Sequence, residues 1–371
     1  MNVCFIANAD SIHTIRWVNY FAQEGYQVSL ITDKPAGAWA RATLQPTIAL
    51  YDLTEYVKVR KIRYLLWVPI VRHLLAKIRP DVLHAHNISG GGWLGAFSSY
   101  HPFIVTSHGS DLMLLSQKSW AHRTLSMYTL RRVDHLSCVS RELRDKAVEY
   151  GVPANKLTMI DLGIDTAIYS PSEDISHLRL KLGLKDVPTV LSIRAIREIY
   201  NPLVIINNIP AVLKDVPTTQ FVIFTYNADP TLLIQLQSTV DDMGVAESVH
   251  FIGKLATESE IADYYCAADV VISIPVSDGT PKSVQEALAC GAVPILSDLP
   301  SLHEWVKHEQ EVLFIPTNGG QRLSKAIVRL LTDDSLRQTL RTNGIKLVCQ
   351  RFDSNICMHH NAEIYKEAMR F

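Results

Sequence analysis

The sequence predicts an α/β protein built from two doubly wound domains, each with a parallel sheet between layers of helices. The chain has 371 residues, which is more than one ordinary hydrophobic core accommodates. Short apolar runs of strand length alternate along it with segments of helical periodicity, as in a parallel sheet with crossover helices. A polar stretch at residues 170–176, SPSEDIS, separates two such series and predicts the boundary between the domains.

The first series predicts a domain over residues 1–169. It begins with a buried strand at 3–7 and a helix at 15–23, which stops before Gly25, a residue common just beyond helix ends. The other strands are expected at 27–32, 82–85, 103–107 and 135–139, and the other helices at 60–78, 120–131 and 141–150.

The second series predicts a domain over residues 170–354. Its strands are expected at 189–193, 220–226, 248–252, 270–273, 293–297 and 312–315, and its helices at 202–213, 231–243, 258–267, 282–290 and 321–331. A last segment, 355–371, reads as a helix that returns to the first domain. Because open α/β sheets bind ligands outside the carboxyl ends of their strands, we expect the substrates in a cleft between the two domains.

The composition excludes several classes of protein. Lys and Arg together number 36 and Asp and Glu 37, so the basic excess of a nucleic-acid-binding protein is missing. The six cysteines form no Cys-x-x-Cys pair, which favours reduced thiols and a cytoplasmic location. The first residues, MNVCFIANAD, lack the flanks of a signal peptide, and no apolar run reaches the roughly 18–20 residues of a membrane span.

Motifs for other nucleotide chemistry are also missing. The turn after the first strand reads Asn-Ala-Asp-Ser at 8–11 rather than Gly-x-Gly-x-x-Gly, which disfavours a dinucleotide-dependent dehydrogenase. The sequence contains neither a P-loop nor an Asp-x-Asp motif, so we expect no metal ion and no cofactor beyond the substrate itself.

The most informative segment is residues 277–294, SDGTPKSVQEALACGAVP. Thr280 is expected to cap a helix whose first residue is Pro281. The backbone amides of Lys282 and Ser283 would then point out of a positive helix start and suit a diphosphate. Two carboxylates, at positions 278 and 286, fit the hydroxyl groups of a hexose and a ribose. The alternative is an ordinary capped helix with a surface glutamate.

This segment resembles the family 4 retaining glycosyltransferases of the GT-B fold, the glycosyl transferases group 1. Their pattern of two acidic residues eight positions apart is present as Asp278 and Glu286, followed by EALACGAVPI. Shorter matching pieces follow in the family's order across nearly the whole chain, at 106–111, 139–140, 163–165, 251–253 and 268–270.

The resemblance implies a GT-B fold of two Rossmann-like domains, a nucleotide-sugar donor and retention at the anomeric carbon. By position, Glu286 corresponds to the residue that binds the ribose, Asp278 and His108 to residues that contact the donor sugar, and Arg194 to a ligand of the diphosphate. The family's lysine is missing, because Tyr200 or Asn201 stands there, and Arg197 is the substitute that we expect. The catalytic residues are therefore predicted to be His108, Arg194, Asp278 and Glu286, and the donor-binding residues Arg194, Arg197, Gly279, Thr280, Lys282, Ser283 and Glu286.

The acceptor is assigned to the first domain. The candidates are His13 and Arg16 in the first loop, and Asp111, for which capping of a helix is the alternative. The three glycines at 90–92 look like a loop that lets an acceptor approach the backbone. The histidines at 84 and 86 share one face of a strand, but no third ligand supports a metal site.

Basic residues surround apolar ones between positions 58 and 79, which suits a helix lying on an anionic membrane. The alternative is a helix packed on the first sheet with its charges in water. The basic residues are Lys58, Arg60, Lys61, Arg63, Arg72, Lys77 and Arg79.

The function expected is transfer of a hexose, by default from a UDP-sugar, to a glycan or lipid-linked acceptor in surface polysaccharide or glycolipid synthesis. The expected location is cytoplasmic, with peripheral contact to the inner face of the membrane as a hypothesis. The alternatives are a non-catalytic partner or sensor that binds a nucleotide sugar, and a GT-B nucleotide-sugar epimerase.

Overall fold

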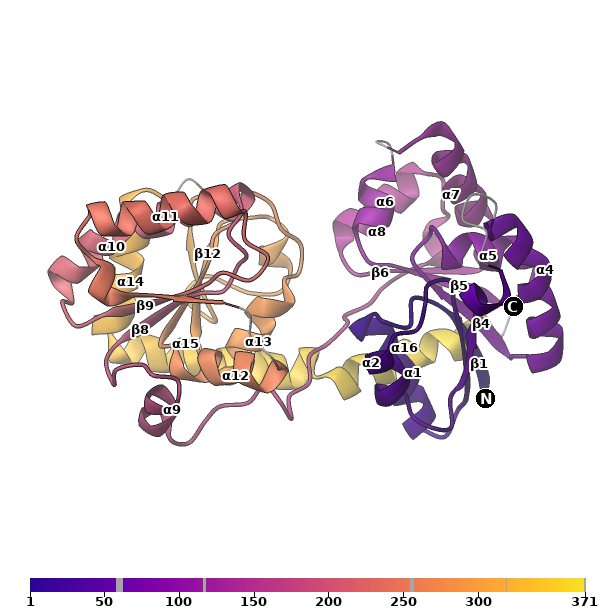
Figure 1. Cartoon of the computed structure of the whole chain (residues 1–371), viewed down its shortest axis with the longest axis horizontal. Helices are drawn as coiled ribbons and strands as arrows, with labels where there is room; N and C mark the ends of the chain where they lie inside the picture. Colours follow the sequence, from indigo (N-terminus) through magenta and orange to yellow (C-terminus); the bar gives the residue numbers. More distant parts are fainter. Residues whose placement is uncertain (58–62, 116–117, 254–256, 318, 370–371) are drawn as a thin grey trace. The chain divides into compact units, whose positions relative to one another are not determined.

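The computed structural model describes residues 1–57, 63–115, 118–253, 257–317 and 319–369. The chain forms two structural units, one of Met1–Leu162 with Cys357–Phe371 and one of Gly163–Ile356 (Figure 1). Each unit holds a parallel sheet covered by helices, so the predicted fold class is confirmed. The chain enters the second unit ahead of residue 170, because Ile164 and Tyr169 are buried in the core of that unit.

The sheet of the first unit has seven strands in the order β3-β2-β1-β4-β5-β6-β7. Its central strands β4 and β5 are buried along their whole length, as a parallel sheet covered on both faces requires. The strands are β1 (Asn2–Ile6), β2 (Gln27–Thr32), β3 (Ala49–Asp52), β4 (Val82–His86), β5 (Phe103–Ser107), β6 (His135–Cys138) and β7 (Leu157–Met159). The helices are α1 (Ile12–Gln23), α2 (Ala38–Thr43), α3 (Leu53–Tyr56), α4 (Arg63–Ile78), α5 (Gly91–Ser98), α6 (Ser110–Met113), α7 (Trp120–Arg132) and α8 (Arg141–Glu149).

The sheet of the second unit has six strands in the order β10-β9-β8-β11-β12-β13. The order reverses between β8 and β11, which are direct neighbours in the sheet although α10, α11 and α12 separate them in the chain. The strands are β8 (Thr189–Ser192), β9 (Gln220–Phe224), β10 (Val249–Ile252), β11 (Val270–Ser273), β12 (Val293–Ser297) and β13 (Leu313–Ile315). The helices are α9 (Ile175–Lys181), α10 (Pro202–Asp215), α11 (Pro230–Asp242), α12 (Glu258–Ala267), α13 (Lys282–Cys290), α14 (Gln321–Thr332) and α15 (Asp334–Leu347).

The glycine-rich stretch after β4 is a correction to the sequence analysis. Gly91 and Gly92 are buried in α5 rather than exposed in a loop open to an acceptor. A β-carbon on Gly91 would lie 2.4 Å from the carbonyl oxygen of Ile6, and one on Gly95 would lie 2.3 Å from the ring of Phe103. The glycines are therefore needed for close packing of this helix on strands β1 and β5.

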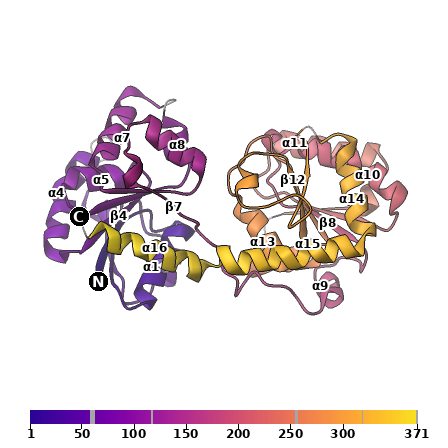
Figure 2. The same cartoon turned by 180° about the vertical axis from the view of Figure 1, so that it is seen from behind.

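The C-terminal helix α16 (Ser354–Ala368) packs on the first unit, as predicted; Figure 2 shows it beside α1. Met358, Ala362 and Tyr365 are buried in one apolar cluster with Phe5 and Phe21. The hydroxyl of Tyr365 lies 2.6 Å from Nδ1 of His84 on β4. A segment from the end of the chain thus completes the core of the first unit.

We predict that Tyr365→Phe lowers the free energy of unfolding of the first unit by about 1–3 kcal/mol, because a ring nitrogen of His84 loses its buried partner. The matched control is Tyr56→Phe, whose side chain is 54% exposed, and which should change stability by less than about 0.5 kcal/mol. Denaturant unfolding of both variants measures the difference. Equal stability of the two variants would show that the contact between Tyr365 and His84 contributes nothing.

Candidate functional site

A pocket of about 420 Å³ lies at the carboxyl edge of the second sheet. The segments that follow β8 and β9 form one side and the start of α13 forms the other, so the pocket is at the point where the strand order reverses. Open α/β sheets bind ligands at this position. The lining residues are Arg194, Ala195, Arg197, Tyr200, Tyr226, Asn227, Pro281, Lys282, Ser283 and Glu286.

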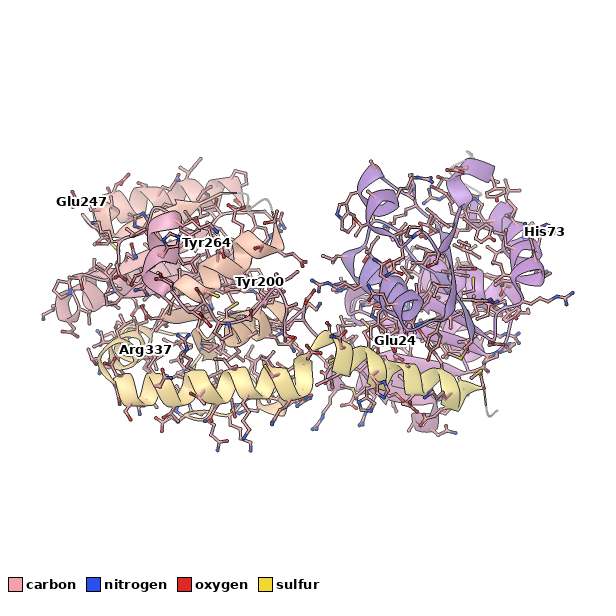
Figure 3. All side chains as sticks on the ribbon, turned by 90° about the horizontal axis from the view of Figure 1, so that it is seen from below. Glu24, His73, Tyr200, Glu247, Tyr264 and Arg337 are labelled. Atoms are coloured by element: carbon pink, nitrogen blue, oxygen red, sulfur yellow. The ribbon has the colours of Figure 1, made fainter. Side chains whose placement is uncertain are left out.

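Arg194 has three partners at the wall of the pocket. Its Nη2 lies 3.0 Å from Oδ2 of Asp278, and its Nη1 donates to the hydroxyl of Ser283 at 3.2 Å. The guanidinium also lies over the ring of Tyr200, 4.4 Å from the ring centre. Tyr200, labelled in Figure 3, belongs to the short turn between β8 and α10. These contacts hold a positive charge against the wall of the pocket.

Asp278 is anchored on the loop that precedes α13. Its Oδ1 accepts the backbone N–H of Gly279 at 2.9 Å, and its carbonyl oxygen accepts the hydroxyl of Ser301 at 2.6 Å. Its Oδ2 is buried and faces Arg194 as an ion pair without the alignment of a hydrogen bond. Asp278, Gly279 and Thr280, which were predicted for the site, are not among the lining residues of the pocket. Asp278 is joined to the pocket by its ion pair with Arg194, and Thr280 directly precedes Pro281.

The start of α13 differs from the prediction. The residue before the helix is Pro281, with ψ of 118°, and the helix itself begins at Lys282. The backbone N–H of Val284 donates to the carbonyl of Pro281 at 3.1 Å, so Pro281 rather than Thr280 caps the helix. Thr280 would cap the helix only if Pro281 had helical angles, but Pro281 is extended and therefore lies outside the helix. The side chain of Pro281 offers no acceptor for a capping hydrogen bond, and the positive end of α13 lies beside the pocket.

Glu286 lies one turn further along α13 than Lys282, on the same face of the helix. The hydroxyl of Tyr265 on α12 donates to its Oε2 at 3.4 Å. Burial, and next the charge of Glu286, raise the pKa of Tyr265 well above its usual range. The phenol therefore stays protonated and serves as a donor to the carboxylate.

Arg197 also reaches the pocket, where its Nη2 donates to Oδ1 of Asn227 at 3.0 Å. Sequence reasoning missed Tyr226 and Asn227, which follow β9. Their signal was available, because polar residues after a strand next to β8 must lie at the same edge of the sheet. Burial raises the pKa of the Tyr226 phenol, so this side chain is neutral at physiological pH.

The remaining predicted residues lie in the first unit. His108 follows β5, and its ring stacks on that of His13 from α1, with the centres 5.6 Å apart and the planes 16° from parallel. Arg16, one turn further along α1, is half-buried, whereas Trp17 is buried and packs against Phe5.

Asp111 is engaged by the chain's own groups. One carboxylate oxygen accepts the Ser107 hydroxyl at 2.9 Å and the Gly109 N–H at 3.1 Å, and the other accepts the Ile88 N–H at 2.9 Å. These bonds position the loop that carries His108, and contact of Asp111 with an acceptor stays a prediction.

His84 and His86 face the core of the first unit. The ring of His84 contacts the hydroxyls of Tyr365 at 2.6 Å and Thr106 at 2.8 Å, so both nitrogens are used within the unit. His86 packs against the rings of His84 and His108, and both of its ring nitrogens are buried without a hydrogen-bond partner among the described residues. The two rings thus form part of a buried array rather than a metal pair.

The basic segment lies partly outside the described residues, since Lys58, Arg60 and Lys61 fall within 58–62. Helix α4 begins at Arg63, whose guanidinium lies 5.1 Å from the ring centre of buried Trp67. Its apolar face packs on the first unit, whereas Leu65 is 75% exposed. Across the portion of the chain that the structure describes, no helix is long and apolar enough to span a membrane.

Comparison with known proteins gives matches over both units. The model of a glycosyl transferase 4-like family matches residues 2–140, and that of the glycosyl transferases group 1 matches residues 174–347. The alpha-monoglucosyldiacylglycerol synthase of Streptococcus pneumoniae is 28% identical over 61% of this chain and 52% of its own length, so the chain spans about half of that relative. The UDP-Gal:alpha-D-GlcNAc-diphosphoundecaprenol alpha-1,3-galactosyltransferase of Escherichia coli is 25% identical over 73% of this chain and 71% of its own length.

Solved structures share the fold. The crystal structure of HepE from Anabaena in complex with UDP has a TM-score of 0.82 at 18% identity and covers 99% of this chain and 100% of that one. The sucrose-phosphate synthase of Thermosynechococcus elongatus has a TM-score of 0.76 at 19% identity and covers 99% and 98%.

We predict that the buried histidines make the first unit less stable in mild acid. Burial, and next the neighbouring His108 and His135, lower the pKa of His84 to about 3, and burial lowers that of His86 well below its usual range. Between pH 6.5 and 3 the unfolded chain binds protons that the folded chain does not, so each such histidine lowers the free energy of unfolding by about 1.4 kcal/mol per pH unit of acidification.

Denaturant unfolding between pH 7 and 5 measures this slope. His86→Phe, which suits the surrounding rings, should reduce it by about one histidine's share. The exposed Leu65 supplies the control, since Leu65→Gln removes no titratable group and should leave the slope unchanged. A wild-type slope that His86→Phe does not alter would show that His86 is protonated in the folded chain.

Proposed function

The chain belongs to the glycosyl transferases group 1 family, with a glycosyl transferase 4-like first domain, and from this premise we propose that it is a glycosyltransferase. It would move a hexose from a nucleotide sugar to a glycan or lipid-linked acceptor. The observation that carries this proposal is the pocket in which two guanidinium groups face the start of α13, with Glu286 one turn along the same helix.

The pocket supplies the contacts that such a donor needs. Arg194, Arg197 and the backbone amides at Lys282 and Ser283 would hold the diphosphate, because each presents positive charge or N–H groups to the same space. Glu286 would accept the ribose hydroxyls, and Asp278 and His108 the hydroxyls of the hexose. We propose UDP as the nucleotide, supported by HepE, whose structure contains UDP, and by the Escherichia coli relative, whose name specifies UDP-Gal.

We propose further that the reaction retains the configuration at the anomeric carbon and needs no divalent ion. In this mechanism the donor diphosphate leaves and the acceptor hydroxyl attacks on the same face of the sugar. The work of the protein is then to stabilise negative charge on the leaving group. Arg194, Arg197 and the start of α13 supply positive charge at that point.

The acceptor would be bound by the first unit, at the loops that carry His13, Arg16 and Asp111. A lipid-linked acceptor is supported by relatives whose names specify a diacylglycerol glycolipid and a diphosphoundecaprenol. We therefore propose peripheral contact with an anionic membrane at the cytoplasmic face, supported by the exposed Leu65 next to the basic segment at 58–63.

We predict that a nucleoside diphosphate raises the melting temperature of the chain and that EDTA does not abolish the shift, because side chains and backbone amides hold the phosphates. The measurement is thermal unfolding with UDP, GDP and ADP and their glucose conjugates. Glu286→Ala should remove most of the shift, whereas the control Glu247→Ala, on the turn after α11, should retain it.

Two results would contradict the proposal. No shift with any of the six compounds in a folded sample excludes donor binding. Conversion of the bound nucleotide sugar to its epimer without an acceptor would favour the epimerase reading instead.

We predict that Arg194→Ala lowers turnover by about a hundredfold or more, because loss of one charge-stabilising donor costs about 2.7–4 kcal/mol of transition-state stabilisation. Binding of the nucleotide sugar should weaken as well. Steady-state rates with the nucleotide sugar that stabilises the protein, and with a lipid-linked or free sugar acceptor, measure the effect. Turnover within a few-fold of wild type would remove Arg194 from the active site.

A further inference from the structure

Arg194 and Asp278 form an ion pair at the pocket, although Arg194 is also expected to bind the diphosphate of the donor. Arg194 lines the pocket, yet its guanidinium is already shared between Asp278, Ser283 and the ring of Tyr200. The side chains of Arg194 and Asp278 are only 16% and 18% exposed, so water compensates little for a broken pair. A diphosphate that recruits Arg194 must therefore compete with Asp278 for the same positive charge.

Asp278 cannot follow Arg194 towards a bound phosphate. One of its carboxylate oxygens accepts the backbone N–H of Gly279, and its carbonyl oxygen accepts the hydroxyl of Ser301, which follows β12. The other carboxylate oxygen, Oδ2, is buried and has no hydrogen-bond partner among the described residues, only the ion pair with Arg194. If Arg194 turns to a phosphate, this oxygen keeps its charge and loses its partner, which is unfavourable in a buried position.

A ligand can offset this loss only if it brings a hydrogen-bond donor of its own. The hydroxyl groups of a hexose attached to the diphosphate are such donors. The nucleoside diphosphate that remains after transfer has none at that end, and its terminal phosphate adds negative charge near the carboxylate. The two ligands therefore differ in what they offer Asp278, although they offer Arg194 the same kind of group.

We propose that Asp278 and Arg194 form a partner-exchange pair that selects the intact nucleotide sugar over the spent nucleoside diphosphate. This role rests on the proposed function. The ion pair between Asp278 and Arg194 would make the site prefer the intact donor to the spent nucleotide. With the intact donor, Arg194 moves to the diphosphate and the sugar hydroxyls replace it at Asp278. With the spent nucleotide, Asp278 retains Arg194, and the product binds weakly and leaves.

The test is a double-mutant cycle on binding, measured by titration calorimetry with UDP and UDP-glucose, or with the GDP or ADP pair if that nucleotide stabilises the chain. Asp278→Asn keeps the oxygen that accepts the Gly279 N–H and removes the charge. It should increase the affinity for UDP by about tenfold, which corresponds to about 1.4 kcal/mol. The affinity for UDP-glucose should stay unchanged or decrease. Inhibition of turnover by added UDP should increase in the same proportion.

The second arm distinguishes exchange of partners from a general effect of charge. In an Arg194→Gln background, Asp278→Asn should change the affinity for UDP by less than about twofold, because the competition for Arg194 no longer exists. The control Asp298→Asn removes the same charge from an exposed residue after β12, and should also leave UDP binding within about twofold of wild type. Unfolding midpoints of all variants show whether they fold. If Asp278→Asn does not fold, Asp278→Ala removes the same charge.

Each other result overturns the inference. If Asp278→Asn still increases the affinity for UDP in the Arg194→Gln background, the carboxylate acts by direct repulsion of the phosphates and not by exchange of partners. Equal tightening of UDP and UDP-glucose, or no tightening, shows that Asp278 does not discriminate between them. Absence of nucleotide binding by the wild-type chain overturns the proposed function and this inference with it, whereas binding without coupling overturns the inference alone.

Discussion

The candidate site depends on the common direction of the strands in each sheet. Parallel strands all end at one edge, so the residue types that follow them gather there however far apart they are in sequence. In the second unit this constraint brings Arg194 after β8 together with Tyr226 after β9 and with the loop from β11 to α13. In the first unit it brings His13 after β1 close to His86 at the end of β4 and to His108 after β5. The apolar strands thus determine which polar groups meet.

The two carboxylates at the pocket have different partners. Arg194, Arg197 and the start of α13 provide positive charge on the pocket wall. Each carboxylate is held by a neighbour, Asp278 by Arg194 and Glu286 by the phenol of Tyr265. Because burial raises the pKa of Tyr265, the phenol stays a neutral hydrogen-bond donor and does not become an anion beside the carboxylate. Glu286 thus has a neutral donor beside its carboxylate, whereas Asp278 has a cation beside its own as long as Arg194 stays in place.

Much of this arrangement could be predicted from the sequence, because hydrophobic periodicity locates most of the strands and their alternation with helices makes them parallel. The residues of the pocket in α13 and after β8 were found in this way, with the resemblance to a family. The edge strands β3 and β7 and the order of the strands in each sheet could not be predicted. Three features required coordinates. The glycines of α5 look like a loop until their approach to Ile6 and Phe103 is known. The position of Pro281 just before α13 depends on its backbone angles. The carboxylate of Asp111 accepts hydrogen bonds from Ile88 and Ser107, which lie in two other segments of the chain.

The features that sequence reasoning missed are linked by a physical cause. Local rules favour a side-chain cap at a helix start, and buried polar atoms normally have partners. At α13 and at Oδ2 of Asp278 the chain departs from both rules. A capping side chain would have occupied the backbone N–H groups that a phosphate needs, and a dedicated hydrogen-bond donor at Asp278 would have removed its need for Arg194. The start of α13 and Oδ2 of Asp278 are thus groups that a ligand can complete, and both lie where a purely local reading of the sequence is least accurate.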